Sequence, residues 1–476
     1  MTPPKRRLGL IVTAAIVIAN MIGTGVFTST GFQAASLHDP LTILLAWVVG
    51  GILALCGAAA YAELGSMMPR AGGEYVYLRE AYHPVAGFMS GWVSLTAGFS
   101  APIAVAALAF SRYLATLLPG LHGDAPWASG TLSLGSLSVS IHLGAGQAIA
   151  MVLIVAVTAL HSFDSKVGGL VQAMFTAAKV LLIVVFITAG LLVGDGSWSH
   201  FASQSGGLAN VGTMAFATAL IYVSFAYSGW NAAAYIANEV ERPERTLPRA
   251  LLLGTGIVMA LYVLLNLVFF YAVPSDKLAG VFEVGDTAAR SLFGQSAGKL
   301  VTSVIALALV SSVSAMIMAG PRVYAAMAID RALPRQLAHH NKRGVPLSAV
   351  ITQGALAIVF CLVGDPDVLI RFVGFTLAIF AALTVSAVFI LRRRGEKAAY
   401  RTWGYPVTPI AFIALSVWIA GAQVYNQPKE SAIIACVLAL GGLVYVTMVR
   451  GKAPLPDESM PEMPEAKVVK IDDDSR

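Results

Sequence analysis

Apolar stretches about 20 residues long recur along the whole chain, and short polar segments separate them. A helix needs about 20 mostly apolar residues to cross the ~30 Å hydrocarbon layer of a membrane. The pattern therefore predicts an all-α membrane protein with about twelve transmembrane helices. The predicted spans cover residues 8–36, 41–67, 84–118, 143–161, 167–193, 211–239, 250–273, 297–327, 347–364, 367–391, 406–426 and 430–449.

Two of these stretches, the first and the sixth, are interrupted at their middle by small residues. The interruptions read Met21-Ile22-Gly23-Thr24-Gly25-Val26-Phe27 and Phe225-Ala226-Tyr227-Ser228-Gly229-Trp230. Backbone that is unwound at membrane depth persists only where it lines a protein cavity, so the two interruptions predict a solute site near the bilayer midplane. The alternative is that the glycines only allow close helix packing. Packing alone does not require matched positions in both halves of the chain.

Composition agrees with a membrane protein, because 57% of the residues are hydrophobic, 12% are charged and the mean hydropathy is +0.76. These values exclude a soluble globular protein. The net charge of +6 does not indicate nucleic-acid binding, since the basic residues stand in short loops between apolar stretches. One set of loops holds Lys5, Arg6, Arg7, Arg70, Arg79, Lys166, Arg242, Arg245, Arg249, Arg331, Arg335, Lys342, Arg343, Arg392, Arg393, Arg394, Lys397 and Arg401, and the other holds Lys277, Arg290 and Lys429. The positive-inside rule then predicts a multi-pass cell-membrane protein with both termini in the cytoplasm, and we expect a bacterial inner membrane.

The two interrupted helices enter the membrane from opposite sides under this topology. Five spans are an odd number, so a repeat of spans 1–5 and 6–10 must be inverted in the membrane, as in many secondary transporters. We therefore expect one polytopic domain over residues 1–450, with repeats at about 8–193 and about 211–391 and accessory spans at about 406–449.

Three segments outside the predicted spans have distinct compositions. Residues 68–83 indicate a cytoplasmic turn and a short amphipathic helix at the gate or the membrane interface. Residues 119–142 form the longest outer loop, and residues 451–476 are a proline-rich and acidic tail that we expect to be disordered and cytoplasmic.

Lys179 is the clearest ionisable residue in the middle of a predicted span. Such residues are costly in a membrane and indicate function by default. Gln172, Thr176 and Lys179 are spaced to share one helix face, which predicts that the lysine points into the bundle. There its ammonium group can replace a bound cation and hold unwound backbone carbonyls. The alternative is a side chain that reaches toward a lipid head group, but from mid-span it would fall short.

Two further charged residues, Glu63 and Arg322, stand near span ends. Their positions are typical of cytoplasmic gate pairs, and equally of ordinary interfacial charges. Arg112, near the outer end of span 3, is most simply a side chain that extends to the membrane surface.

The two interruptions also predict what kind of solute binds. Unwinding at Ile22–Val26 frees N–H groups at the start of one half-helix and C=O groups at the end of the other, and these match a carboxylate and an ammonium group. Phe225–Gly229 offers further carbonyls. We therefore expect a zwitterionic amino acid, over which Phe225 and Trp230 could close. Each aromatic taken alone is equally well explained by lipid contact or core packing.

Four segments of the chain resemble the amino acid-polyamine-organocation superfamily, and especially its L-type amino acid transporter branch. They are Ile22-Gly23-Thr24-Gly25-Val26-Phe27, Gly72-Gly73-Glu74-Tyr75-Val76-Tyr77-Leu78-Arg79, Phe175-Thr176-Ala177-Ala178-Lys179, and the stretch from Tyr227-Ser228-Gly229-Trp230-Asn231 through Asn238-Glu239-Val240-Glu241-Arg242-Pro243 to Arg245-Thr246-Leu247-Pro248-Arg249-Ala250. The resemblance covers spans 1–10 and implies the five-plus-five inverted repeat, with helices 1 and 6 unwound at mid-membrane and span 8 beside them.

The resemblance also implies roles for individual residues. The amides of Thr24 and Gly25 would hold the substrate carboxylate, and Phe225 would be the gating aromatic. Lys179 would occupy a sodium-like position. The expected substrate-binding set is Ile22, Gly23, Thr24, Gly25, Phe225, Ala226 and Ser228, with Trp230 as a second gating residue and Ser311, Ser312 and Ser314 beside Lys179.

The same comparison gives expectations about coupling and partners. A lysine at the sodium-like position disfavours sodium coupling, and exchange and proton symport both remain open. The outer loop 119–142 lacks the cysteine of animal L-type members, so we expect no disulfide-linked heavy chain. Cys56, Cys361 and Cys436 have no CxxC spacing, and neither a metal site nor a cofactor is expected.

The expected substrate is a neutral L-amino acid. The spans that would line its side chain carry Phe99, Phe110, Phe372 and Phe375 but no mid-span acid, so a cationic side chain would be left unpaired. A cationic amino acid or polyamine antiporter is the alternative within the same class. A membrane amino acid sensor is the alternative from another class. An enzyme is not expected, because no span carries a catalytic constellation.

Overall fold

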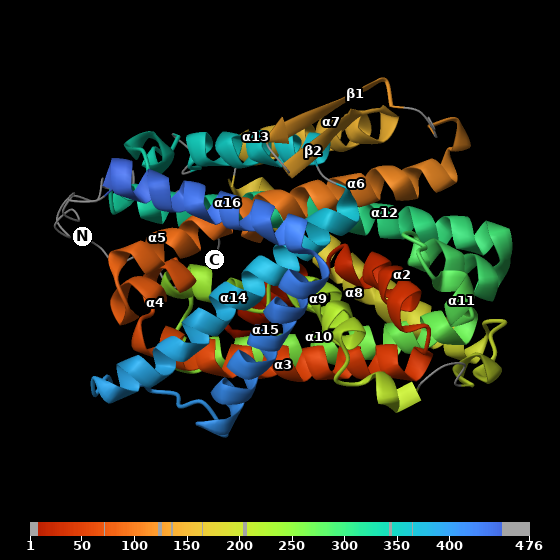
Figure 1. Cartoon of the computed structure of the whole chain (residues 1–476), viewed down its shortest axis with the longest axis horizontal. Helices are drawn as coiled ribbons and strands as arrows, with labels where there is room; N and C mark the ends of the chain where they lie inside the picture. The colour runs from red at the N-terminus through yellow and green to blue at the C-terminus, as the bar shows by residue number, and fades with distance from the viewer. Residues whose placement is uncertain are drawn as a thin grey trace, which may run out of the picture.

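The computed structural model describes residues 8–70, 72–121, 126–134, 137–163, 165–202, 207–341, 345–363 and 365–449. The described chain is a bundle of α-helices, most of which run along the longest axis of the molecule (Figure 1). Its first half contains α1 (Leu10–Met21), α2 (Gly25–Leu37), α3 (Pro40–Met67), α4 (Glu74–Ala81), α5 (Pro84–Val93), α6 (Ala101–Leu117), α7 (Ala145–Phe163) and α8 (Ser165–Leu192). Its second half contains α9 (Met214–Tyr227), α10 (Pro243–Ala272), α11 (Ser275–Leu278), α12 (Val284–Ile329), α13 (Leu347–Val363), α14 (Pro366–Arg393), α15 (Val407–Asn426) and α16 (Pro428–Val444).

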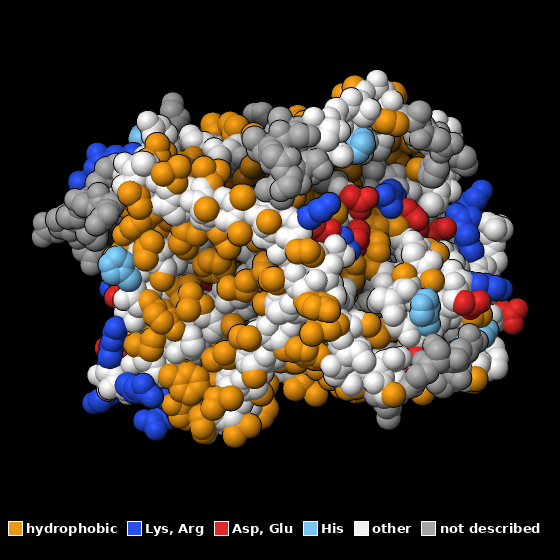
Figure 2. Space-filling view, in the orientation of Figure 1, with side chains coloured by type: hydrophobic (Ala, Val, Ile, Leu, Met, Phe, Trp, Pro, Cys, Tyr) orange, Lys and Arg blue, Asp and Glu red, His pale blue; other side chains and the backbone are white. Residues whose placement is uncertain are grey.

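Within the described residues, ten helices are long and apolar enough to cross a membrane. The sixth and ninth predicted spans are not among them, because α9 has 14 residues and α13 has 17. Helix α9 is short because it stops at the second group of small residues, and a turn follows it. Figure 2 shows hydrophobic side chains over much of one face of the molecule, with lysine and arginine side chains at the left end and others on the right half.

Helix geometry stops at both sequence interruptions. Helix α1 ends at Met21, Ile22 has an extended backbone, and α2 begins at Gly25. Helix α9 ends at Tyr227, and the 3₁₀-helix η5 (Ala232–Glu239) follows a turn. Gly229 in that turn has a φ of +97°, a conformation that glycine adopts without a steric penalty.

A short backbone pairing joins the segment before α1 to the end of η5. The N–H of Leu8 donates to the carbonyl of Glu239, and the N–H of Glu241 donates to the carbonyl of Leu8, at 3.1 and 3.0 Å. These two bonds form an isolated parallel bridge between Leu8 and Val240. The segment before α1 is therefore attached to the segment that follows η5.

The segments between the spans differ from the sequence-based expectations. The expected outer loop 119–142 contains an antiparallel hairpin of β1 (Ala128–Leu134) and β2 (Leu137–Leu143). The expected amphipathic helix in residues 68–83 is present as α4, but most of its side chains are buried rather than interfacial. Packing against α5 and α14 covers it. The expected tail, residues 451–476, lies outside the described residues.

Candidate functional site

The two helix breaks lie directly against each other. A Cβ atom placed on Gly25 would be 2.4 Å from the Cα of Ala226, and one placed on Gly229 would be 2.7 Å from the carbonyl oxygen of Asn20. Real side chains never approach backbone this closely, so both contacts require glycine. The fold thus brings together the two segments that the sequence singles out, although about 200 residues separate them.

The start of α2 presents unpaired donors to this contact. The first N–H groups of any helix have no partner inside the helix. Thr24 precedes α2, and its side chain makes no capping hydrogen bond. Its hydroxyl is buried and has no partner within the described part of the chain. A helix N-terminus with these free donors favours an anion such as a carboxylate.

Lys179 lies on α8 and reaches the end of α1. Its ammonium nitrogen donates to the carbonyl oxygens of Ala19 at 3.1 Å and Ile22 at 2.8 Å, and the residue is only 2% exposed. Ser312 of α12 donates to the same Ile22 oxygen at 3.4 Å. The lysine therefore supplies positive charge to two carbonyls at the end of α1. Thr176 is also buried, and the side chain of Gln172 lies outside the described residues.

Other carbonyls at the end of α1 are likewise occupied. Tyr262 of α10 donates its hydroxyl to the Met21 oxygen at 2.6 Å. Because Lys179 and Ser312 already bond Ile22, little acceptor capacity is left on that carbonyl. At the end of α9, the carbonyl of Phe225 accepts from the N–H of Ser228 at 3.0 Å and keeps one lone pair for a ligand ammonium group.

Phe225 and Trp230 occupy different surroundings. Phe225 belongs to a hydrophobic cluster with side chains of α6, α12 and α14, including Ile317 and Phe375. Trp230 packs edge-on against Tyr61 of α3, with ring centroids 4.6 Å apart, and against Phe412 of α15. The two rings therefore do not cover the same space. Phe225 is the one placed among the spans expected to line a substrate side chain.

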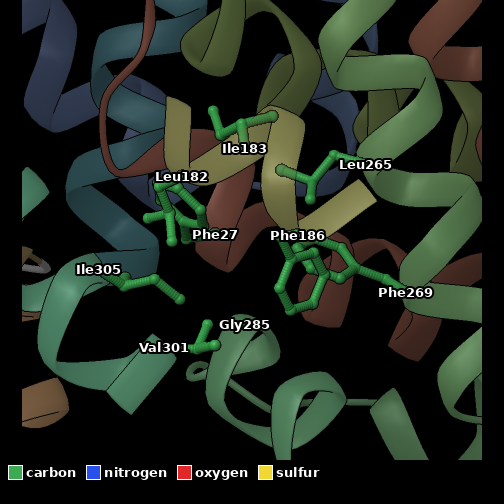
Figure 3. A pocket seen from close by; sticks show the side chains of 9 residues that line it. All are labelled: Phe27, Leu182, Ile183, Phe186, Leu265, Phe269, Gly285, Val301 and Ile305. Carbon is green, nitrogen blue, oxygen red and sulfur yellow. The ribbon is translucent and has the colours of Figure 1, made fainter. Parts of the chain in front are cut away.

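Two cavities flank the breaks, and their linings differ. The first, about 10 Å³ in volume, lies between α2, α8, α10 and α12 and has only apolar side chains and a glycine around it (Figure 3). It offers no group that would hold a zwitterion. The second, about 60 Å³ in volume, lies beside the second break between α3, α9, α14 and α15, and Glu74, Ser228 and Asn231 contribute polar groups to it.

The three serines expected beside Lys179 are all buried on α12. Ser312 faces the α1 carbonyl as described above, whereas Ser314 bonds His161 of α7, with 2.8 Å between its hydroxyl and the Nε2 atom. His161 is 4% exposed. No local sequence signal indicates its partner, because the two residues are 153 positions apart.

A polar cluster joins the four helices α2, α9, α14 and α16. Arg371 of α14 bonds Glu430 of α16 at 2.8 Å and Asp367 one turn earlier at 2.5 Å. Tyr222 of α9 donates to Asp367 at 2.7 Å and stacks on Phe32 of α2, with ring centroids 5.3 Å apart. The cluster ties both broken helices to α14 and α16. No single sequence motif predicted this cluster.

Glu63 and Arg322, the two predicted gate charges, do not pair with each other. Glu63 of α3 accepts two bonds from Arg392 of α14, both 2.7 Å long, and two more from the amide and hydroxyl of Thr402. Arg322 contacts Glu239 at 3.5 Å, and both side chains are about 40% exposed. Of these two ion pairs, the one between Glu63 and Arg392 is the better shielded from solvent.

Glu63→Gln is expected to lower the free energy of unfolding by about 2 kcal/mol, because the neutral amide cannot accept all four bonds and loses charge-assisted strength. Thermal unfolding of the purified protein measures the change. Glu80→Gln is the matched control, since the Glu80 side chain is 46% exposed and its ion pair contributes little. Equal shifts for the two variants would contradict the structural role of Glu63.

Comparison with known proteins adds an independent finding. A family model described as amino acid permease matches residues 8–444. The serine/threonine exchanger SteT of Bacillus subtilis (strain 168) is 33% identical, and the match covers 94% of this chain and 98% of that protein. The b(0,+)-type amino acid transporter 1 of Homo sapiens is 27% identical, with 93% and 88% covered. The large neutral amino acids transporter small subunit 2 of Mus musculus is 26% identical, with 93% and 80% covered.

Proposed function

Since the chain belongs to the amino acid permease family of the amino acid-polyamine-organocation superfamily, we propose that it is a sodium-independent transporter of neutral L-amino acids. It works by alternating access, as an exchanger or a proton-coupled symporter. Membership of this family makes it a multi-span transporter of the cell membrane rather than an enzyme. The direction of transport, the coupling and the substrate preference are part of the proposal.

The contact of Lys179 with the end of α1 is the observation that carries this proposal. Its ammonium group bonds the carbonyls of Ala19 and Ile22 within a buried site. A sodium ion at the same carbonyls would meet a fixed positive charge, so sodium coupling is disfavoured. The proposed architecture is about twelve spans in a five-plus-five inverted repeat, with the breaks of helices 1 and 6 at the centre.

The substrate would bind in the contact between the two breaks. The amides of Thr24 and Gly25 hold its carboxylate at the start of α2, with Gly23 and Ile22 completing that loop. The carbonyls of Phe225, Ala226 and Ser228 hold its ammonium group. Phe225 closes over the ligand, and Trp230, which lines the neighbouring cavity, is the second gating residue.

The neutral preference follows from the lining of the proposed side-chain pocket. Phe372 and Phe375 of α14 are buried in the cluster that contains Phe225. A cationic side chain there would remain unpaired at a cost of several kcal/mol. SteT, a relative by sequence, is a serine/threonine exchanger, which favours exchange of small neutral substrates here as well. A disulfide-linked partner is not part of the proposal, because residues 119–142 contain no cysteine.

Counterflow in proteoliposomes tests the proposal directly. Vesicles preloaded with unlabelled L-serine, L-threonine or L-leucine should accumulate the labelled amino acid without a sodium gradient. Uptake of L-arginine or putrescine should be at least about tenfold slower, since an unpaired buried charge costs more than the ~1.4 kcal/mol that a factor of ten requires.

Three outcomes would each contradict one part of the proposed function. Stimulation by a sodium gradient would overturn sodium independence. Arginine or putrescine exchange at the rate of serine would instead indicate the cationic antiporter. Binding of an amino acid without counterflow of any in the panel would remove the transport function and favour a membrane sensor.

A further inference from the structure

Glu74 is the first residue of α4 and lies beside the second helix break. The residue is 4% exposed, and its Oε1 atom accepts two hydrogen bonds. The hydroxyl of Tyr61 donates one at 2.6 Å, and the side-chain amide of Asn231 donates the other at 2.7 Å. Tyr61 belongs to α3, and Asn231 stands between α9 and η5. One carboxyl oxygen thus connects the segment after the break to two neighbouring helices.

The same carboxyl lines the larger of the two cavities. Ser228 and Asn231 stand beside it there, together with the rings of Trp230 and Phe412. A cavity of about 60 Å³ with several polar groups has room for water, which needs only about 15 Å³ and two or more polar partners. A water molecule in this space would give the Glu74 carboxyl a partner for proton exchange.

No lysine, arginine or histidine among the described residues lies within ion-pair distance of Glu74. The titratable groups that face it are the phenols of Tyr61 on α3, Tyr77 on α4 and Tyr235 on η5, and Ser90 of α5 adds a hydroxyl. Phenols ordinarily lose their protons near pH 10, so all three stay neutral where a carboxyl titrates. Burial raises the pKa of Glu74, and the bonds from Tyr61 and Asn231 offset only part of this effect.

We propose that Glu74 is a proton-binding site of this protein, which holds Asn231 below the second break when ionised and loosens it when protonated. The inference rests on the proposed transport function and assigns it a proton-sensitive element other than Lys179. Charge-assisted hydrogen bonds are about twice as strong as neutral ones, so a proton on the carboxyl weakens both bonds at Oε1. The segment between α9 and η5 is then freer to move.

Counterflow of labelled L-serine, measured over a pH series that rises from the ordinary pKa of a glutamate, tests this role, because burial raises the pKa of this carboxyl. Wild-type exchange should change with pH in one transition. Glu74→Gln should remove the transition and hold the rate at the wild-type value found at low pH. Glu80→Gln, on the same helix but exposed, should keep the wild-type profile. A wild-type profile without a transition, or the same transition in Glu74→Gln, would overturn the proposal.

Tyr61→Phe supplies a second variant that keeps the carboxyl in place. Removing one donor to the ionised form makes ionisation less favourable, so the transition should shift to higher pH. A transition at the wild-type pH in this variant would show that the titrating group is not the one that Tyr61 bonds.

Thermal unfolding provides a readout that does not depend on transport. A carboxyl with a raised pKa in the folded state binds more protons there than in the unfolded state, so it stabilises the fold at low pH. This contribution disappears as the pH rises through the folded-state pKa. The Tm of the wild type relative to Glu74→Gln should therefore fall with rising pH. Absence of counterflow for every amino acid would remove the proposed transport function alone, whereas a pH-independent Tm difference would remove the proton site.

Discussion

Lys179→Ala is expected to reduce amino acid counterflow by about a hundredfold. The substitution removes an ammonium group that donates to the carbonyls of Ala19 and Ile22 and leaves both acceptors buried. A hydrogen bond from a charged group contributes about 1.5–3 kcal/mol, so the loss of two bonds is enough to supply the ~2.8 kcal/mol that a hundredfold change requires. The measurement is the initial rate of counterflow at saturating internal substrate, normalised to the amount of folded protein.

Two further variants separate the role of this charge from a general loss of folding. Lys277→Ala removes a lysine from the short helix α11 and should leave counterflow within a factor of about two, since surface substitutions are usually small in effect. Lys179→Arg keeps the charge but places a larger planar group in the same site, so it should recover only part of the rate. Wild-type counterflow in Lys179→Ala would show that the end of α1 needs no cation.

The same variant separates two candidates for the proton site. The residual activity of Lys179→Ala should keep the pH transition assigned to Glu74. A variant that loses this transition would place the titrating proton on Lys179. Comparing Lys179→Ala with Glu74→Gln in the same vesicles therefore identifies which residue titrates.

Gly25→Ala is expected to lower counterflow about tenfold or more while leaving most of the fold intact. The new methyl group would lie 2.4 Å from the Cα and 2.7 Å from the Cβ of Ala226, and 3.1 Å from its amide nitrogen. Backbone atoms cannot yield as a flexible side chain does, so the two breaks must separate. Overpacking of this kind costs about 1–3 kcal/mol. The added methyl group lies where Thr24 and Gly25 would hold the substrate carboxylate.

Gly256→Ala is the matched control for this substitution. Gly256 lies in α10, and a Cβ placed on it meets no heavy atom within 4 Å. Alanine also favours helix over glycine by about 1 kcal/mol, so this variant should fold at least as well as the wild type. Equal counterflow in Gly25→Ala and Gly256→Ala would show that the breaks do not meet at the substrate site.

Local sequence patterns predicted the apolar helices, the positions where two of them stop and the direction of the Lys179 side chain. Hydropathy located the apolar helices, and small residues marked where α1 and α9 stop. The spacing of Gln172, Thr176 and Lys179 on one helix face predicted that the lysine points into the bundle, where it bonds Ile22. Each of these inferences used residues that are close in sequence, because helix periodicity and the cost of a buried charge act over a few turns.

The features that the sequence did not reveal depend on contacts between distant elements. Glu74 belongs to a segment that hydropathy assigns to a cytoplasmic connection, and only the packing of α3, α5 and α14 buries it. His161 and Ser314 are 153 positions apart, and no spacing rule connects them. Trp230 follows the second break directly, yet its ring turns toward α3 and α15, which adjacency in sequence did not indicate.

The backbone bridge between Leu8 and Val240 couples two segments that are far apart in the sequence. Two backbone hydrogen bonds attach the segment before α1 to the residues at the end of η5. Pulling either segment outward strains the other through two backbone hydrogen bonds. We therefore expect the start of α1 and the end of η5 to move as one unit, because separating them would break both hydrogen bonds.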